Sequence, residues 1–342
     1  MILETVIISL LKIVFVLAVL LLTVAYAVYF ERKIAAWVQN RIGPNRVGPL
    51  GLLQPFADVF KLLLKEDIVP EKSNKFIHTL APIIALIVAF STYAVIPFGP
   101  EVTLFGYKVS LVVADVNIGI LYVLALTSLG VYGITFAGWS SGSKYSLFGG
   151  IRSSAQMISY EVSMGFSVAG VIMLAGSLEP TKIVAYQSGL MWNAFTQPIG
   201  FITFLVAAFA ETNRMPFDLP EAEPELVGGY HTEYSSMKFA SFFLAEYANM
   251  IVACGIITTL YLGGWQVPYL EKLNLGEFWT PIIQVMAFFV KIGAMLFFMI
   301  WVRWSLPRFR YDQLMNLGWK VMFPLALLNV IWVAFLIMGL NL

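Results

Sequence analysis

The stretch IIQVMAFFVKIGAMLFFMIWV, Ile282–Val302, holds one charged residue, Lys291, and is otherwise almost entirely apolar. About 17–25 residues of this kind cross the hydrocarbon layer of a bilayer as an α-helix. Similar runs recur along the 342-residue chain, of which 59% is hydrophobic and 12% is charged. An ordinary soluble domain is about 25% charged. We therefore expect an all-α polytopic membrane protein that forms a single membrane domain.

Eight transmembrane helices are expected, and the fifth is short unless it begins in the Trp192–Pro198 region. They lie near residues 5–30, 77–97, 117–138, 154–176, 197–211, 239–262, 282–302 and 321–340. The first run differs from a cleaved signal peptide, because it is too long, holds Lys12 and lacks a small-residue cleavage site. It is interpreted as an uncleaved span.

The basic residues of the loops predict the orientation. Sixteen of the 21 Lys and Arg residues lie in loops that follow odd-numbered spans. The opposite loops hold three, Lys108, Lys182 and Lys272. Because cytoplasmic loops carry an excess of Lys and Arg, the loops after odd-numbered spans are expected on the cytoplasmic (or matrix) side. Both termini are then expected on the non-cytoplasmic side.

Composition excludes several functional classes. The formal net charge of +1 argues against nucleic acid as a partner, which requires a basic excess. The single cysteine, Cys254, excludes an intrachain disulfide, a multi-cysteine zinc site and an iron–sulfur cluster. His78 and His231 are far apart in the sequence. We expect no metal site, no bound cofactor and no redox centre in this chain.

The first long loop contains a Gly- and Pro-rich segment followed by an amphipathic one. QNRIGPNRVGP, Gln39–Pro49, is unsuited to a helix. In GLLQPFADVFKLLLK, Gly51–Lys65, apolar residues recur at helical spacing opposite Asp58 and Lys61. An amphipathic helix over residues 50–65 is therefore expected, too short to span and lying along the membrane surface or against the spans.

The loop 212–238 carries an acidic cluster. It contains Asp218, Glu221, Glu223 and Glu225, and like charges this close resist simultaneous ionisation. A solvated acidic loop and a divalent-cation site are two alternatives, although the spacing does not match an EF-hand. The apolar flanking residues, including Phe217, favour a docked loop whose protonation responds to a nearby event.

Several ionisable residues are expected at membrane depth, where they are costly and often functional. They are Glu31, Asp115, Glu161, Glu211, Glu246 and Lys291, with Lys12 in the first span. Each could also be a helix-end residue that reaches water or a member of a buried ion pair. For Glu161, Glu246 and Lys291 a functional role is favoured, because nothing on the same helix face neutralises them.

Four segments together resemble one family closely. They are YFERKIAAWVQNRIGPNRVGP (29–49), GLLQPFADVFKLLLK (51–65), GWSSGSKYSLFGGIRSSAQMISYE (138–161) and ETNRMPFDLPEAEPELVGGYHTEYSSMKF (211–239). They are similar to the family of the membrane subunit, designated H, of proton-pumping NADH:quinone oxidoreductase, respiratory complex I. This family includes mitochondrial NADH dehydrogenase subunit 1. The resemblance runs from about Tyr29 to the last span.

The resemblance implies that the chain forms the membrane side of the quinone chamber. The implied chamber residues are Arg32, Trp37, Arg41, Phe56, Asp58 and Lys61 at the entrance and Arg214, Phe217, Asp218, Glu221, Glu223 and Glu225 at the acidic loop. The implied coupling residues are Glu31, Asp115, Glu161, Glu211, Glu246 and Lys291. The chain itself is expected to hold no catalytic residue.

The same resemblance implies a hetero-oligomer. Peripheral-arm subunits would bring NADH, FMN and iron–sulfur clusters, and antiporter-like membrane subunits would lie alongside, with quinone as the substrate. The loop sequences favour a bacterial inner membrane over a mitochondrial one. Alternatives are the homologous subunit of a membrane-bound hydrogenase or of a ferredoxin-dependent quinone complex, a secondary transporter with a midplane site, and a structural anchor.

Overall fold

The computed structural model describes residues 2–104, 107–189, 192–218, 227–270 and 276–340. The long helices are α1 (Ile2–Val38), α3 (Lys75–Thr92), α4 (Gly119–Ser140), α5 (Lys144–Ala175), α8 (Pro198–Glu211), α10 (Ser236–Tyr261), α11 (Gly276–Ser305) and α13 (Phe323–Leu340). The shorter helical elements are η1 (Pro49–Gly51), α2 (Gln54–Leu64), η2 (Tyr93–Val95), α6 (Pro180–Tyr186), α7 (Asn193–Thr196), η3 (Gly229–His231), α12 (Tyr311–Asn316) and the π-helical turn η5 (Leu317–Met322). Strands β1 (Val102–Leu104) and β2 (Tyr107–Val109) form a small antiparallel hairpin, with Val102 opposite Val109.

Seven helices in the described part of the chain are long and apolar enough to cross a membrane. The expected all-α polytopic membrane protein is therefore confirmed. The remaining predicted span corresponds to α8, which has 14 residues. It begins at Pro198 because Gln197, at φ −135° and ψ 69°, interrupts the helical backbone after α7. A proline at the first turn starts a helix readily, since its missing N–H would have no partner there.

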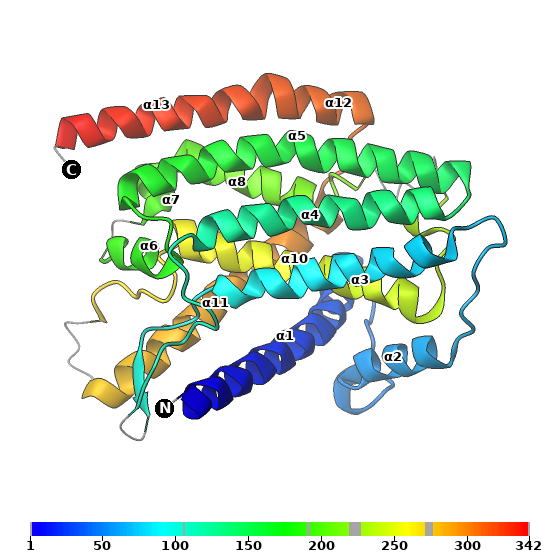
Figure 1. Ribbon diagram of the computed structural model, residues 1–342, viewed down its shortest axis with the longest axis horizontal. Coiled ribbons are helices and arrows are strands. Elements are labelled where there is room, and N and C mark those ends of the chain that lie inside the picture. Colours follow the sequence, from blue (N-terminus) through cyan, green and yellow to red (C-terminus); the bar gives the residue numbers. More distant parts are fainter. Residues whose placement is uncertain (1, 105–106, 190–191, 219–226, 271–275, 341–342) are drawn as a thin grey trace.

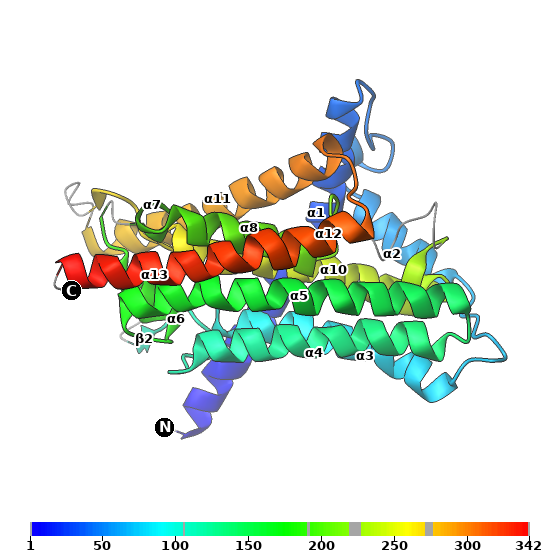
Figure 2. The ribbon, with the colours of Figure 1, turned by 90° about the horizontal axis from the view of Figure 1, so that it is seen from above.

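The helices run side by side, and both termini lie at the same end of the bundle (Figures 1 and 2). The opposite end carries α2 and the turn between α4 and α5 (Figure 1). The long connection from α1 to α3 therefore lies at the end where the basic loops were expected. This arrangement gathers the polar connecting segments at one end of an apolar bundle.

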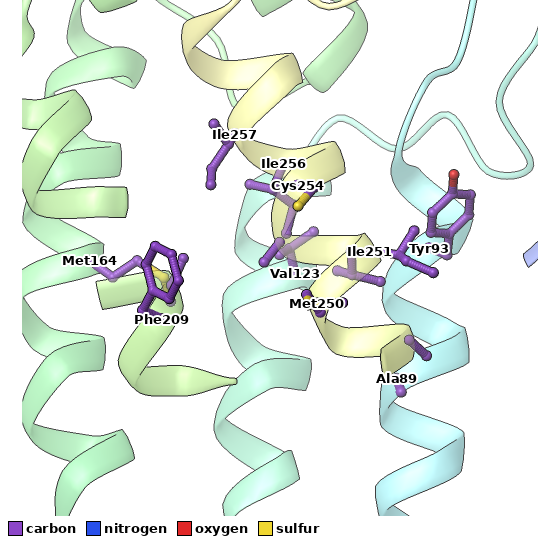
Figure 3. Packing of buried hydrophobic residues seen from close by; sticks show 14 of the residues in the cluster. Ala89, Tyr93, Val123, Met164, Phe209, Met250, Ile251, Cys254, Ile256 and Ile257 are labelled. Carbon is purple, nitrogen blue, oxygen red and sulfur yellow. The ribbon is translucent and has the colours of Figure 1, made fainter. Parts of the chain in front are cut away.

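Helix α10 forms the centre of the core. Its residues from Tyr247 to Tyr261 are nearly all buried, including Cys254. A helix that is apolar on every side requires neighbours all round it. Figure 3 shows Met250, Ile251 and Ile256 of α10 among side chains of α3, α4, α5 and α8. Glu246, which directly precedes this buried segment, is consequently only 11% exposed.

Helix α2 lies outside this core. Of its residues only Pro55 is buried, and the apolar residues Phe56, Phe60 and Leu64 are 44%, 65% and 88% exposed. Ion pairs and hydrogen bonds attach it to the bundle. Its position therefore depends on a few polar contacts rather than on burial.

Candidate functional site

A buried charge cluster joins α1, α10, α11 and the segment that follows α8. The Arg214 guanidinium lies between two carboxylates, with Nη1 2.8 Å from Glu31 Oε2 and Nε 2.5 Å from Glu246 Oε1. Glu31 also accepts hydrogen bonds from Tyr247 Oη, at 2.8 Å, and from Arg303. The side chains of Arg214 and Glu31 are only 4% and 7% exposed. Charges buried this deeply are stable only when they are paired in this way.

The acidic loop begins beside this cluster. The carboxylate of Asp218 accepts a hydrogen bond from Arg308 Nη2 at 2.9 Å and is 7% exposed. Burial raises the pKa of Asp218, against the lowering effect of Arg308. The Phe217 ring packs between Tyr160 and Phe309, at centroid distances of 5.4 and 5.5 Å. This first part of the loop is docked, as the apolar flanks indicated.

Glu161 and Glu211 are brought together from α5 and α8. They interact electrostatically, and each accepts a hydrogen bond from a hydroxyl of α4. The donors are Thr127 for Glu211 and Ser128 for Glu161. Neighbouring residues of α4 therefore contact the two glutamates, one hydroxyl each.

Two small cavities lie on either side of Glu211. One, of about 60 Å³, is lined by Glu211 and Glu246 together with Thr127 and Asn249. The other, of about 20 Å³, is lined by Thr127, Glu211 and apolar side chains. Glu246 of the charge cluster and Glu211 therefore face the same enclosed space. The ionisable groups form a series from Glu31 to Glu161.

A third, larger cavity of about 650 Å³ opens between α1, α11 and the turn before α2. Its walls are largely apolar and include Phe30 and Ile34 on α1, Leu52 before α2, and Gly293 and Ile300 on α11. Phe30 directly precedes Glu31, and Ile300 lies one helical turn from Arg303. The apolar cavity therefore ends close to the charge cluster.

None of the residues expected at the entrance is buried. Arg32 of α1 pairs with Asp58 of α2, Nη1 to Oδ2 2.6 Å, and Asp58 also accepts a hydrogen bond from Gln54. Trp37 is 67% exposed. The other expected entrance residues, Arg41, Phe56 and Lys61, are also at least partly exposed.

Lys291 and Asp115 lie apart from the glutamate series. The Lys291 ammonium donates to the main-chain oxygens of Leu262, Gly264 and Gln266 at 2.7, 2.9 and 2.7 Å. It therefore binds the turn that follows α10, which begins about 24 Å of helix away from Glu246 at a rise of about 1.5 Å per residue. Asp115 is exposed and accepts a hydrogen bond from Thr181.

Three expected site residues, Glu221, Glu223 and Glu225, lie outside the described residues. Within the described ranges, no group of three or more His, Cys, Asp or Glu side chains is arranged to hold a metal ion.

Comparison with known proteins places this geometry in a family. The profile of the family described as NADH dehydrogenase matches residues 11–334. The chain belongs to this family. NADH-quinone oxidoreductase subunit 8 of Rhodothermus marinus is 55% identical over 326 residues, which cover 92% of this chain and 93% of that protein. An NADH-quinone oxidoreductase subunit of Salinibacter ruber is 53% identical over 325 residues, 92% of each chain. Another, of Geobacter metallireducens, is 53% identical over 332 residues, 94% of this chain and 93% of that protein.

Membership in the NADH dehydrogenase family confirms the resemblance stated from the four segments and makes the chain a subunit of an oxidoreductase. The secondary transporter is not supported by any of these relatives.

Sequence reasoning missed several residues of the site. They are Thr127, Ser128, Gln156, Tyr247, Arg303 and Arg308. Gln156 of α5 is buried and its Nε2 donates to the main-chain oxygens of Ala210 and Phe217 at 2.7 and 2.8 Å, which holds the start of the acidic loop. Arg303 and Arg308 contributed to the prediction only as basic loop residues. Because Arg303 and Arg308 lie far from Glu31 and Asp218 in the sequence, these ion pairs could not be predicted from it.

Proposed function

We propose that this chain forms the membrane part of the quinone-binding chamber of an NADH-quinone oxidoreductase, and that it couples quinone reduction to proton translocation. The observation that carries the proposal is the continuous arrangement from an apolar cavity, through the charge cluster at Arg214, to the buried glutamates. The names of the relatives supply the substrate class, a quinone.

The large cavity suits the apolar tail of a quinone. Ligand pockets are mostly apolar, with a few polar groups that fix orientation, and occupy about 300–1,000 Å³. The cavity of about 650 Å³ has this character along Ala27, Phe30 and Leu296. It leads from between α1 and α11 toward Glu31. We assign the entrance to the pair Arg32–Asp58 and to α2, with Trp37, Arg41, Phe56 and Lys61 around it.

Reduction of a quinone to a quinol takes up two electrons and two protons. The electrons would come from partner subunits that bring NADH, FMN and iron–sulfur clusters, and this chain would supply the charged surroundings. Arg214 and Arg308 hold Glu31, Glu246 and Asp218 as paired carboxylates. A change of charge beside them shifts which carboxylate is paired, since like and opposite charges nearby alter ionisation. The rest of the acidic loop, Glu221, Glu223 and Glu225, is included in this role.

The change in ionisation of these carboxylates would pass along the glutamate series. Glu246 and Glu211 line one cavity of about 60 Å³. A space of that size is large enough for water, since about 10–15 Å³ suffices to hold one molecule. Thr127 and Ser128 then connect Glu211 with Glu161 on α5. We place Lys291 and Asp115 outside this path, because the former binds the turn that follows α10 and the latter is exposed.

The chain would work within a multi-subunit complex in a bacterial inner membrane. Exposed apolar side chains at the α2 end, such as Trp37, Ile42 and Leu64, are suited to contact with peripheral-arm subunits. Antiporter-like membrane subunits would receive the signal from Glu161. Both termini would lie on the non-cytoplasmic side, which agrees with their common position in Figure 1.

The chamber is tested by filling its cavity. At Gly293 of α11 an added Cβ meets no heavy atom within 4 Å. Because Gly293 lines the cavity, the side chain of Gly293→Phe starts in open space and occupies part of it. In the assembled complex we expect it to raise the KM for a long-tailed quinone about tenfold, which corresponds to about 1.4 kcal/mol of lost binding.

The matched control is Gly339→Phe on α13, where an added Cβ also meets nothing within 4 Å. NADH oxidation with a water-soluble electron acceptor, which does not need the cavity, reports intact assembly in both variants. An unchanged quinone KM in assembled Gly293→Phe complexes would refute the chamber assignment.

A further inference from the structure

The start of α10 is attached by four polar contacts to the last turn of α2 and to the segment 66–68 that directly follows it. Ser235 Oγ accepts a hydrogen bond from the Ile68 amide at 2.8 Å and donates to Glu66 O at 3.1 Å. Ser236 Oγ donates to Leu62 O at 3.0 Å. Lys238 Nζ lies 2.9 Å from Asp67 Oδ2. We call Ser235, Ser236 and the Lys238–Asp67 pair the α2 anchor.

The anchor is maintained at a cost to α10 itself. Ser235 is the N-cap of α10, where a serine hydroxyl normally accepts a bond from the first turn of its own helix. Here the Ser235 side chain makes no capping bond. Ser236 has φ +51°, a left-handed conformation that costs a non-glycine residue about 1 kcal/mol. Local strain that is retained in this way points to a function for the contact it produces.

The anchor has a rigid base. Tyr234 directly precedes it and stacks on His78 of α3, with ring centroids 3.9 Å apart and an interplanar angle of 6°. The Tyr234 hydroxyl also lies 3.3 Å from Ser140 Oγ at the end of α4. The anchor therefore connects α2 to a segment that is itself packed against α3, α4 and α10.

The other end of α2 is held by α1. Tyr29 Oη donates to Leu50 O at 2.8 Å, and Arg32 pairs with Asp58. Between these attachments, the apolar face of α2 is exposed. Because burial does not hold the helix, its two attached ends decide where it lies.

Leu52, just before α2, lines the large apolar cavity together with α1 and α11. A shift of α2 moves Leu52 and changes the width of that opening. We propose that the α2 anchor positions α2, and that Ser235, Ser236, Lys238 and Asp67 are positioning residues that set the access of a long apolar tail to the cavity. This inference rests on the proposed quinone chamber.

The test compares quinones of two tail lengths in the assembled complex. Ser235→Ala/Ser236→Ala removes three hydrogen bonds and leaves the cavity lining intact. We expect the KM for a long-tailed quinone to rise about tenfold, the scale of one or two lost hydrogen bonds. The KM for a short-tailed quinone stays near the wild-type value, because a short tail needs less of the passage. A merely structural role would lower the amount of complex without changing the ratio of the two KM values.

Two further variants sharpen the test. Ser241→Ala is the control, since its hydroxyl donates within α10 to Met237 O. The charge exchange Asp67→Lys/Lys238→Asp restores the long-tail KM that either single change raises. A KM ratio equal to that of Ser241→Ala overturns the proposal. If Gly293→Phe still raises the long-tail KM, only the anchor is refuted. If Gly293→Phe has no effect either, the chamber assignment itself fails.

Discussion

Arg214 is the residue on which the charge cluster depends. It neutralises Glu31 and Glu246 from two different helices, and its guanidinium also lies 4.2 Å from the centre of the Tyr247 ring. Arg214 therefore contacts both buried carboxylates, while Arg303 adds a second positive charge at Glu31. Such a group is far more costly to remove than an exposed partner, because it leaves uncompensated charges in a low-dielectric interior.

We expect Arg214→Met to destabilise the chain by roughly 3–5 kcal/mol, the cost of breaking a buried ion pair. Thermal unfolding and the yield of assembled complex measure the effect. Arg310→Met is the matched control, since Arg310 is 75% exposed and lies 4.0 Å from an exposed Asp312. Equal stability of the two variants would show that Arg214 does not hold the cluster together.

At the scale of a single residue, the protonation state of His231 can also be tested, because it makes stability depend on pH. Burial lowers the pKa of His231 to about 4, from an ordinary value of 6.5, and its ring packs against Phe239 and Phe243. The folded chain therefore binds fewer protons at this site than the unfolded chain. The neutral ring stabilises the fold fully above about pH 6.5, and this contribution is lost as the pH falls toward 4.

His231→Phe keeps an aromatic ring and removes the titration. The difference in Tm between wild type and variant is expected to be constant above about pH 6.5 and to move in favour of the variant below it. A difference that is independent of pH down to about 4.5 would contradict the assigned protonation state.

The sequence identified Glu31, Arg214 and Glu246 as site residues but did not pair them. Their types and their positions within or beside apolar runs are local information. The ion pair between Glu31 and Arg303 joins residues from α1 and α11, so it depends on how the helices pack. The contacts of Thr127 and Ser128 with the glutamates also depend on helix packing. From the sequence alone, hydroxyls in an apolar helix are expected to bond back to their own backbone.

At the scale of elements, the pattern of apolar runs predicted the presence of each helix more accurately than its first and last residues. Helix α8 was expected to be short, and the chain geometry at Gln197 and Pro198 accounts for its first residue. Lys291 was assigned to a proton path because it lies mid-span. Its three carbonyl acceptors belong to Leu262, Gly264 and Gln266, in the turn that follows α10.

Helix α2 illustrates what an amphipathic pattern does not determine. The spacing of its apolar residues predicts a helix, and the structure has one over Gln54–Leu64. The pattern does not determine the position of the helix relative to the bundle. Hydrogen bonds from Ser235 and Ser236, which lie far along the chain, contribute to that position. The effect expected for Ser235→Ala/Ser236→Ala therefore belongs to this scale.

At the scale of the whole molecule, basic residues and buried carboxylates occupy different regions. Basic residues concentrate in the loops at the α2 end, where Figure 1 places the long connection between α1 and α3. Carboxylates lie inside, on α1, α5, α8 and α10. Hydropathy and loop charge predicted this division, because both follow from the cost of transferring charge into a bilayer. The continuity of the glutamate series required the packed bundle.

That continuity is tested most directly at Glu211, which connects the charge cluster with Glu161. Glu211→Gln keeps the size and polarity of the side chain and removes its titration. The control is Glu179→Gln, which affects a carboxylate paired with Lys182 at the N-terminus of α6, away from the series. Both complexes are reconstituted in vesicles, and quinone-dependent NADH oxidation is measured together with proton translocation.

We predict that assembled Glu211→Gln complexes oxidise NADH normally with a water-soluble acceptor. Their quinone-dependent turnover and proton translocation fall by about a hundredfold, the low end of what a proton-transferring group contributes. Normal proton translocation by fully assembled Glu211→Gln complexes would contradict the proposed coupling path.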